Sequence, residues 1–170
     1  PSPCWRSACW LHCFGRRVPD VVLRLRQSAI CLLLVVLSYH QSAGLIGNDT
    51  KLDLTADPGR FLGRALNLWN PNSAFGQLQN QAYGYLWPMG TFHLLGAWLQ
   101  LPAWVVQRSW MALLLVTAFL GVLRLGARLD LGTPHTRLLG ALFYALAPRV
   151  LTEIGGNSSA VLPVAVLPWV

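Results

Sequence analysis

Charged residues, and acidic residues in particular, are scarce in this 170-residue sequence. They make up 11% of the chain, and only six residues are Asp or Glu, whereas a typical soluble domain carries roughly 25% charged residues. A disordered or acidic protein is therefore excluded, and a soluble globular fold is disfavoured. Hydrophobic residues reach 54%, and the mean hydropathy is +0.46. This composition predicts an integral membrane protein with the lipid bilayer as a partner.

A contiguous basic patch is also missing, although the net charge is +7. Of the 13 basic residues, Lys51 is the single lysine, and apolar runs separate the scattered arginines. A nucleic-acid-binding face needs basic residues clustered on one surface, so no nucleic-acid partner is expected. In a membrane protein the same excess of positive charge is typical of cytoplasmic loops.

Cysteine and histidine form no recognisable metal or disulfide pattern. The spacing of the cysteines fits neither a zinc C-x2-C pair nor a disulfide framework; they are Cys4, Cys9, Cys13 and Cys31. The histidines His40, His93 and His135 lie far apart in the sequence. No metal site is therefore predicted from these residues.

Three apolar segments predict transmembrane helices at about residues 28–46, 109–127 and 137–154. Five arginines precede the first segment, so the positive-inside rule places residues 1–26 in the cytoplasm. A signal peptide is the alternative, and either interpretation places the residues that follow outside. We expect residues 1–26 to be a cytoplasmic tail or an extension foreign to the natural protein. Because the sequence stops inside an apolar run, we expect residues 27–170 to be the N-terminal part of a longer transmembrane domain.

The first two segments are separated by a polar stretch whose apolar end is broken by Gly96 and Pro102. If that end lies at the interface, eight basic residues are cytoplasmic and three are outside, as the positive-inside rule favours. We therefore expect one extracytoplasmic loop, residues 47–107, that ends in interfacial helices. Their Trp-rich face would contain Trp87, Trp98, Trp104 and Trp110. The predicted fold class is all-α: a multi-pass transmembrane helical bundle with a long extracytoplasmic first loop.

The third segment contains Arg149 and Glu153, which would share one face of a helix. Charges at membrane depth are costly and usually face a cavity or each other. Alternatively, the helix ends near Ala147 and the pair lies in headgroup water. The sequence does not decide between these interpretations.

Half of the acidic residues lie within nine positions of the outer loop, at Asp49, Asp53 and Asp57. Residues four apart point to the same side of a helix or strand, so the spacing predicts a carboxylate cluster at the outer membrane surface. Such a cluster suits general-base catalysis on a sugar hydroxyl or a divalent cation near a phosphate. Asp57 is the weakest member, because Asp57-Pro58-Gly59 is an ordinary turn sequence, and polar residues at a membrane exit need no function.

A second cluster, residues 75–88, combines amide and aromatic side chains. Sugar-binding sites use aromatic faces together with amides that donate and accept hydrogen bonds. Aromatic residues near a bilayer are also typical of an anchoring belt, which leaves the amides unexplained. The candidate sugar-binding residues are Gln77, Gln79, Asn80, Gln81, Tyr83 and Tyr85.

A family resemblance is carried by the long run NDTKLDLTADPGRFLGRALNLWNPNSAFGQLQNQAYGYLWPMGTFHLLG. The sequence resembles the N-terminal end of the actinobacterial α-(1→3)-arabinofuranosyltransferases, membrane glycosyltransferases of the GT-C architecture. The resemblance extends from about residue 41 to the end, through LPAWVVQRSW and LFYALAPRVLTEIGGNSS, and residues 1–26 do not share it.

The resemblance implies a multi-pass enzyme of the cell membrane whose site faces the extracytoplasmic side, with Asp49 as the catalytic aspartate that takes the proton from the acceptor hydroxyl. Asp53 would stabilise developing positive charge, and Lys51 or Arg149 would meet the leaving phosphate. The implied donor is decaprenyl-phosphoryl arabinofuranose, and the implied acceptor is a cell-wall arabinan of arabinogalactan or lipoarabinomannan. Family members are far longer, so the fragment alone is not expected to be active.

Two other functions stay open at this stage. One is a non-catalytic transporter subunit for polyprenyl-linked sugars, and the other is a different lipid-phosphate-dependent transferase, such as a mannosyltransferase. No cofactor is assigned from the sequence, and a divalent cation is left open.

Overall fold

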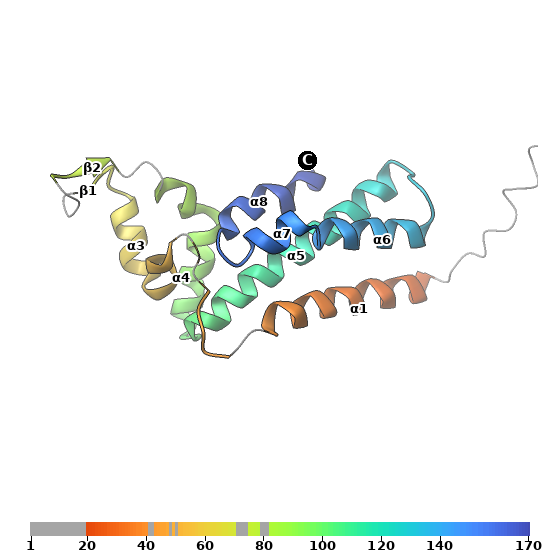
Figure 1. Cartoon of the computed structure of the whole chain (residues 1–170), viewed down its shortest axis with the longest axis horizontal. Coiled ribbons are helices and arrows are strands. Elements are labelled where there is room, and N and C mark those ends of the chain that lie inside the picture. Colours follow the sequence, from red (N-terminus) through yellow and green to blue (C-terminus); the bar gives the residue numbers. More distant parts are fainter. Residues whose placement is uncertain (1–19, 41–42, 48, 50, 71–74, 79–81) are drawn as a thin grey trace, which may run out of the picture.

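The computed structural model describes residues 20–40, 43–47, 49, 51–70, 75–78 and 82–170. Within these ranges the chain is mostly helical (Figure 1). The longer elements are α1 (Asp20–Tyr39), α3 (Pro58–Ala65), α4 (Thr91–Trp98), α5 (Ala103–Arg128), α6 (Pro134–Ala145) and α8 (Ser158–Val166). The short ones are α2 (Leu52–Ala56), β1 (Trp69–Asn70), β2 (Gln77–Leu78), η1 (Ala82–Tyr85), η2 (Leu86–Gly90), α7 (Pro148–Glu153) and η3 (Leu167–Trp169). The two strands pair antiparallel, with Trp69 opposite Leu78.

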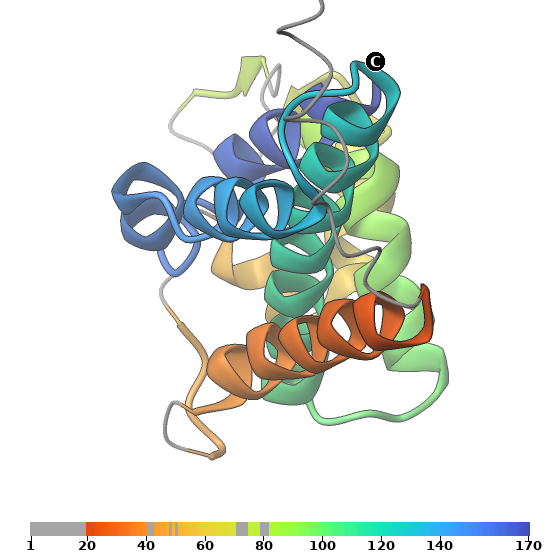
Figure 2. The same cartoon turned by 90° about the vertical axis from the view of Figure 1, so that its right-hand side faces the viewer.

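Helix α5 is the centre of the molecule, and α1, α4, α6 and α8 pack on it (Figures 1 and 2). The hydrophobic core joins these helices through Leu34 of α1, Phe119 of α5, Ala141 of α6 and Ala165 of α8. Among the described residues, two helices are long and apolar enough to cross a membrane, Val21–Tyr39 and Ala103–Arg128. The prediction of a mostly helical fold is confirmed; the strands form one two-residue ladder.

Helices α1 and α5 differ in their bounds from the first two predicted segments. Helix α1 begins at Asp20 and ends at Tyr39 rather than covering 28–46, since arginines are good helix formers and do not end a helix. Its end precedes Gly44, whose positive φ of 82° suits a glycine. Helix α5 begins at Ala103 rather than near 109, directly after Pro102. Proline fits this position because it needs no hydrogen-bonded N–H at the start of a helix.

The predicted third segment, 137–154, is two helices, α6 and α7. Helix α6 ends at Ala145, and Pro148 begins α7, because a proline disfavours a helical conformation in the residue before it. Arg149 and Glu153 both lie on α7, where they form an ion pair at 3.3 Å with Arg149 76% exposed. The pair therefore lies beyond the break and not within a continuous helix.

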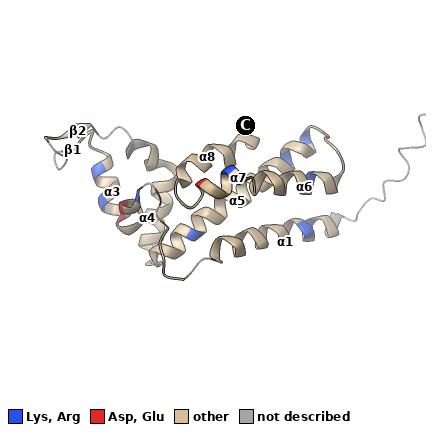
Figure 3. Cartoon of the chain, in the orientation of Figure 1, with Lys and Arg blue, Asp and Glu red and all other residues tan. Residues whose placement is uncertain are grey.

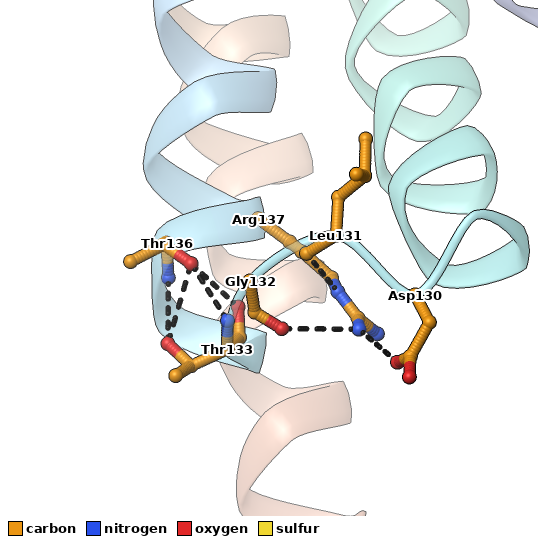
Figure 4. Close-up of polar contacts among 6 residues, drawn as sticks. All are labelled: Asp130, Leu131, Gly132, Thr133, Thr136 and Arg137. Carbon is orange, nitrogen blue, oxygen red and sulfur yellow. Dashed lines mark hydrogen bonds and ion pairs between the residues drawn. The ribbon is translucent and has the colours of Figure 1, made fainter.

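The turn between α5 and α6 is fixed by side-chain to backbone hydrogen bonds (Figure 4). Arg137 donates to the carbonyl oxygens of Leu131 at 2.7 Å and Gly132 at 3.1 Å, and forms an ion pair with Asp130 at 2.8 Å. Thr133 caps the first turn of α6 in a reciprocal capping box. These bonds return the chain so that α6 lies against α5.

Helices α1 and α5 run antiparallel, so basic residues from separate segments meet at one end. Arg26 of α1 donates to His135, at the start of α6, over 3.1 Å. At the other end of the pair, the Tyr39 hydroxyl lies 2.6 Å from the Ser109 hydroxyl. Helices α2 and α3 carry a separate group of charges, away from the basic residues of α1 and from the α5–α6 turn (Figure 3). The chain from α2 to α4 therefore leaves and returns at the same end of the α1–α5 pair.

Candidate active site around Asp49

The Asp49 side chain is buried between segments that lie far apart in the sequence. The residue is 3% exposed. The Ser158 backbone N–H donates to Oδ1 of Asp49 at 3.2 Å, and the Ser158 hydroxyl donates to Oδ2 in a short hydrogen bond. Because Ser158 begins α8, this carboxylate lies at the first turn of a helix, where a negative charge is stabilised.

A clamp from α5 holds the backbone that leads to Asp49. The Gln107 side chain accepts from the Gly47 N–H at 2.8 Å and donates to the Gly47 carbonyl at 3.1 Å. Arg108 donates to the carbonyl of Leu45 at 3.2 Å. Gln107 and Arg108 are 1% and 2% exposed. Alternate residues of this extended segment are thus bound to α5 much as they would be to a neighbouring strand.

Gly47 lies at the clamp where a second segment approaches closely. A Cβ at this position would lie 3.2 Å from the Gly155 carbonyl oxygen, which belongs to the turn before α8. A larger residue would fit only if the Gly155 carbonyl moved by a few tenths of an ångström. The clamp therefore joins the Asp49 segment, α5 and the start of α8.

Trp110 extends the hydrogen-bonded chain into the core. Its indole N–H donates to the Ser158 hydroxyl oxygen at 3.2 Å. Trp110 is 2% exposed and Ser158 is 0% exposed. This position corrects the prediction that Trp110 belongs to a Trp-rich interfacial face: α5 begins at Ala103, so Trp110 lies two turns into the helix and faces α8. Trp87 and Trp98 of that predicted face are exposed.

His93 is the titratable side chain that faces Asp49 from α4. It is 2% exposed, and its Nε2 atom has no hydrogen-bond partner among the described residues. Burial lowers the pKa of His93, and the charge of Asp49 opposes this change with a smaller effect. A neutral imidazole is therefore favoured next to the buried carboxylate.

The predicted cluster of three carboxylates does not form. Asp53 is exposed and pairs with Arg64 at 2.7 Å, and Asp57 caps α3 by accepting from the Arg60 N–H at 3.0 Å. These two aspartates line one hollow of about 280 Å³ together with Arg60 and Arg64, without Asp49. The prediction was wrong because the chain changes from extended to helical at Leu52, so a spacing of four no longer places side chains together.

Lys51 and Tyr85 lie close to the Asp49 site. The Lys51 ammonium is 6.0 Å from the centre of the Tyr85 ring. The Tyr85 hydroxyl is 3.3 Å from that of Ser159, the residue after Ser158. Two residues were predicted to bind the phosphate, Lys51 and Arg149. The described contacts connect Lys51 to the Asp49 site, whereas Arg149 pairs with Glu153 on α7.

The predicted amide cluster is described in part. Gln77 is exposed on β2, opposite Asn70. The positions of Gln79, Asn80 and Gln81, together with the side chain of Tyr83, lie outside the described residues. Their role in sugar binding stays a prediction.

An apolar hollow of about 420 Å³ lies beside the buried site. Its walls come from η2, α4, α5 and α8, and include Trp87, Phe92, Leu95, Trp110 and Leu162. Trp110 therefore connects the hollow to the buried site, since its ring lines the hollow while its N–H donates to Ser158.

Among the described residues, no three His, Cys, Asp or Glu side chains come together as metal ligands.

Sequence reasoning missed the residues that hold Asp49. Ser158 lies 109 residues later in a Gly- and Ser-rich turn with no pattern of its own. Gln107 and Arg108 did carry a signal, because two strongly polar residues interrupt an otherwise apolar run. His93 was considered for metal binding alone, and not as a neighbour of a buried acid.

The described residues define the class as a mostly helical domain with two helices long and apolar enough to cross a membrane. A carboxylate is buried at one end of these long helices. Residues 33–170 match the family model of the α-(1→3)-arabinofuranosyltransferase N-terminal GT-C domain. The chain belongs to this family, as the resemblance in the sequence predicted.

Known relatives agree with this assignment. The chain is 58% identical over 136 residues to an α-(1→3)-arabinofuranosyltransferase of Mycolicibacterium smegmatis, and 54% identical to that of Mycobacterium tuberculosis. Each alignment covers 80% of this chain and 10% of the relative. The chain thus spans about a tenth of the length of these curated relatives.

A solved structure shares the fold. The cryo-EM structure of the arabinofuranosyltransferase AftD from mycobacteria aligns with a TM-score of 0.81 and 48% identity, covering 85% of this chain and 11% of that one. A variant of that enzyme aligns with a TM-score of 0.82 and 49% identity, covering 86% and 12%.

Proposed function

We propose that this chain supplies the catalytic base of a membrane arabinofuranosyltransferase. Asp49 takes the proton from a hydroxyl of a cell-wall arabinan acceptor as its oxygen bonds to the anomeric carbon of arabinofuranose. The bond from that carbon to the donor phosphate breaks, and the polyprenyl phosphate leaves with the electron pair. The observation that carries the proposal is the buried Asp49 carboxylate, fixed by Ser158 and by the clamp on its segment. The activity named for the relatives supports the type of reaction.

A polyprenyl-phosphate donor is supported by the apolar hollow next to this site. Isoprenoid chains are apolar, and the hollow between η2, α4, α5 and α8 has the aromatic and aliphatic walls that would accept one. Its shared wall residue, Trp110, is one hydrogen bond from Ser158 and two from Asp49. The lipid part of the donor would thus end near the proposed base.

Lys51 is the residue that we assign to the leaving phosphate. It follows Asp49 by two residues, and its ammonium group lies over the Tyr85 ring. A positive charge there would stabilise the negative charge that develops on the departing phosphate oxygen. We assign Asp53 no role in the reaction, because its carboxylate is paired with Arg64 in a separate exposed hollow.

The proposed site faces the extracytoplasmic side of the cell membrane. Arg26 of α1, Arg128 at the end of α5 and Arg137 in the first turns of α6 lie at the opposite end of the long helices. Positive residues favour the cytoplasmic side, so the end that carries Asp49 would lie outside. The lipid tail of the donor then stays in the bilayer while the sugar reaches the acceptor.

The test is a chimeric enzyme in which this chain replaces the matching 136 residues of the M. smegmatis relative. Asp49→Asn keeps the shape of the side chain but cannot act as the base, so we expect transfer of arabinofuranose to fall by roughly 10²- to 10⁴-fold. Asp130→Asn, at the exposed turn, is the matched control and should leave transfer unchanged. Tm in detergent reports that both variants fold.

Retention of transfer by Asp49→Asn would overturn the proposal. A transporter subunit for polyprenyl-linked sugars predicts that outcome, with translocation intact. A mannosyltransferase predicts that the chimera transfers mannose and not arabinofuranose, with the same dependence on Asp49.

A further inference from the structure

The hydrogen bonds around Asp49 have a defined direction. An indole N–H can donate but cannot accept, so the Ser158 oxygen must be the acceptor from Trp110 at 3.2 Å. Ser158 has one hydroxyl proton, and that proton is directed to Oδ2 of Asp49. The backbone N–H of Ser158 supplies the second donor, to Oδ1. Each carboxylate oxygen of Asp49 therefore accepts a hydrogen bond from Ser158.

This direction suits the ionised form of Asp49 and opposes the protonated form. An ionised carboxylate accepts only, whereas a protonated one must donate. If Asp49 donated to Ser158, the Ser158 hydroxyl proton would have to turn elsewhere. Another acceptor within its reach is the sulfur of Met89 at 3.9 Å, and thioether sulfur is a weak acceptor.

We propose that Trp110 and Ser158 are positioning residues that hold Asp49 as an acceptor-only carboxylate, oriented to take a proton. This proposal rests on the proposed role of Asp49 as the base. Trp110 acts through Ser158, and Ser158 acts on Asp49. This series of hydrogen bonds begins at Trp110, which also lines the apolar hollow. The Trp110 side chain therefore connects the proposed donor-binding wall to the base.

Other charged groups near the site differ in how they face Asp49. His93 faces it from α4, as a buried imidazole whose pKa is lowered by burial. Arg108 of α5 is directed to the Leu45 carbonyl and the Met111 sulfur. Lys51 is directed to the Tyr85 ring. The direct donors that the two Asp49 oxygens receive from α8 both come from Ser158.

The experiment measures transfer against pH in the chimeric enzyme with Ser158→Ala and Trp110→Phe. Ser158→Ala removes the hydroxyl donor, and we expect kcat to fall by roughly 10- to 100-fold. The acidic limb of the pH–rate profile should also move to higher pH, because Asp49 loses a partner that favours its ionised form. KM for the donor should change little. Trp110→Phe keeps an aromatic wall in the hollow and should shift the limb in the same direction by less.

The matched control is Trp98→Phe, at an exposed tryptophan of α4, which should leave the profile unchanged. If Ser158→Ala does not fold, the Trp110→Phe profile decides alone. An acidic limb that stays in place in the folded variants would overturn the proposal while Asp49→Asn still abolishes transfer. Transfer by Asp49→Asn would instead overturn the proposed function, whatever the two profiles show.

Discussion

Asp49 and Asp53 belong to the same loop, four residues apart, yet their environments are opposite. Asp49 is 3% exposed and accepts hydrogen bonds from the buried Ser158. The Asp53 side chain is 52% exposed and pairs with the partly exposed Arg64. The two residues differ because one ends an extended segment bound to α5, whereas the other lies in the first turn of α2. A spacing that suggests a shared site does not create one when the backbone conformation changes between the residues.

The partners of the two aspartates also lie at different distances along the sequence. Arg64 follows Asp53 by 11 residues, whereas Ser158 follows Asp49 by 109. A contact of the second kind exists only once α5, α6 and α8 have packed together. The Asp49 environment therefore depends on tertiary structure, and the Asp53 environment depends on local helices.

Removal of the Gln107 clamp should have the largest effect on this contrast. Gln107→Met keeps the length of the side chain but leaves the N–H and C=O of Gly47 without their partner. Unpaired groups of this kind cost about 1–3 kcal/mol each, so we expect the loss of two partners to lower the free energy of unfolding by about 2–6 kcal/mol. Transfer by the chimeric enzyme should fall as well, because Asp49 is displaced. Unfolding in detergent and transfer assays measure the two effects.

Two further substitutions, Gln107→Glu and Gln77→Met, are controls for Gln107→Met. In Gln107→Glu the new carboxyl group keeps an acceptor for the Gly47 N–H and, when it is protonated, also a donor for the Gly47 carbonyl. At low pH its effect should therefore be smaller than that of Gln107→Met. Gln77 is exposed on β2, and its substitution should change the free energy of unfolding little. An unfolding curve for Gln107→Met that matches the unsubstituted protein would show that the clamp does not hold the Asp49 segment.

The sequence was sufficient to predict the features that depend on composition and local pattern. The apolar character of α1 and α5, the break at Pro102 and the turn at Asp57 all follow from residue type, whereas the sequence left the break at Pro148 undecided. The family resemblance added Asp49 as the acid of interest. The burial of Trp110 and the contact from Ser158 could not be predicted, because they depend on how α5 and α8 pack. A tryptophan near a membrane interface has the same local pattern whether it faces lipid or the core.

His93 provides a smaller, pH-dependent test of the buried region. Burial lowers its pKa below the usual 6.5, so the unfolded chain binds a proton more readily than the folded one. The stabilising contribution is therefore present above about pH 6.5 and is lost as the pH falls. His93→Gln should reduce the drop in Tm between about pH 7.5 and pH 5.5. Asp49→Asn should enlarge the drop, because the carboxylate that favours protonated His93 is gone.

His135→Gln is the control for this measurement, since His135 is exposed at the start of α6. Its profile should follow that of the unsubstituted protein. An equal loss of Tm at low pH in His93→Gln would mean that another group causes the acid sensitivity.

Asp53→Asn should have the smallest effect and completes the comparison with Asp49. An exposed ion pair contributes about 0.2–1 kcal/mol to stability, so loss of the Asp53–Arg64 pair should lower Tm slightly. Transfer should be nearly unchanged, because Asp53 faces a hollow that Asp49 does not share. High salt should reduce the difference in Tm further, since it screens exposed charges. If Asp53→Asn instead reduced transfer as strongly as Asp49→Asn, the two carboxylates would act together in the reaction, and the four-residue spacing would have indicated the site after all.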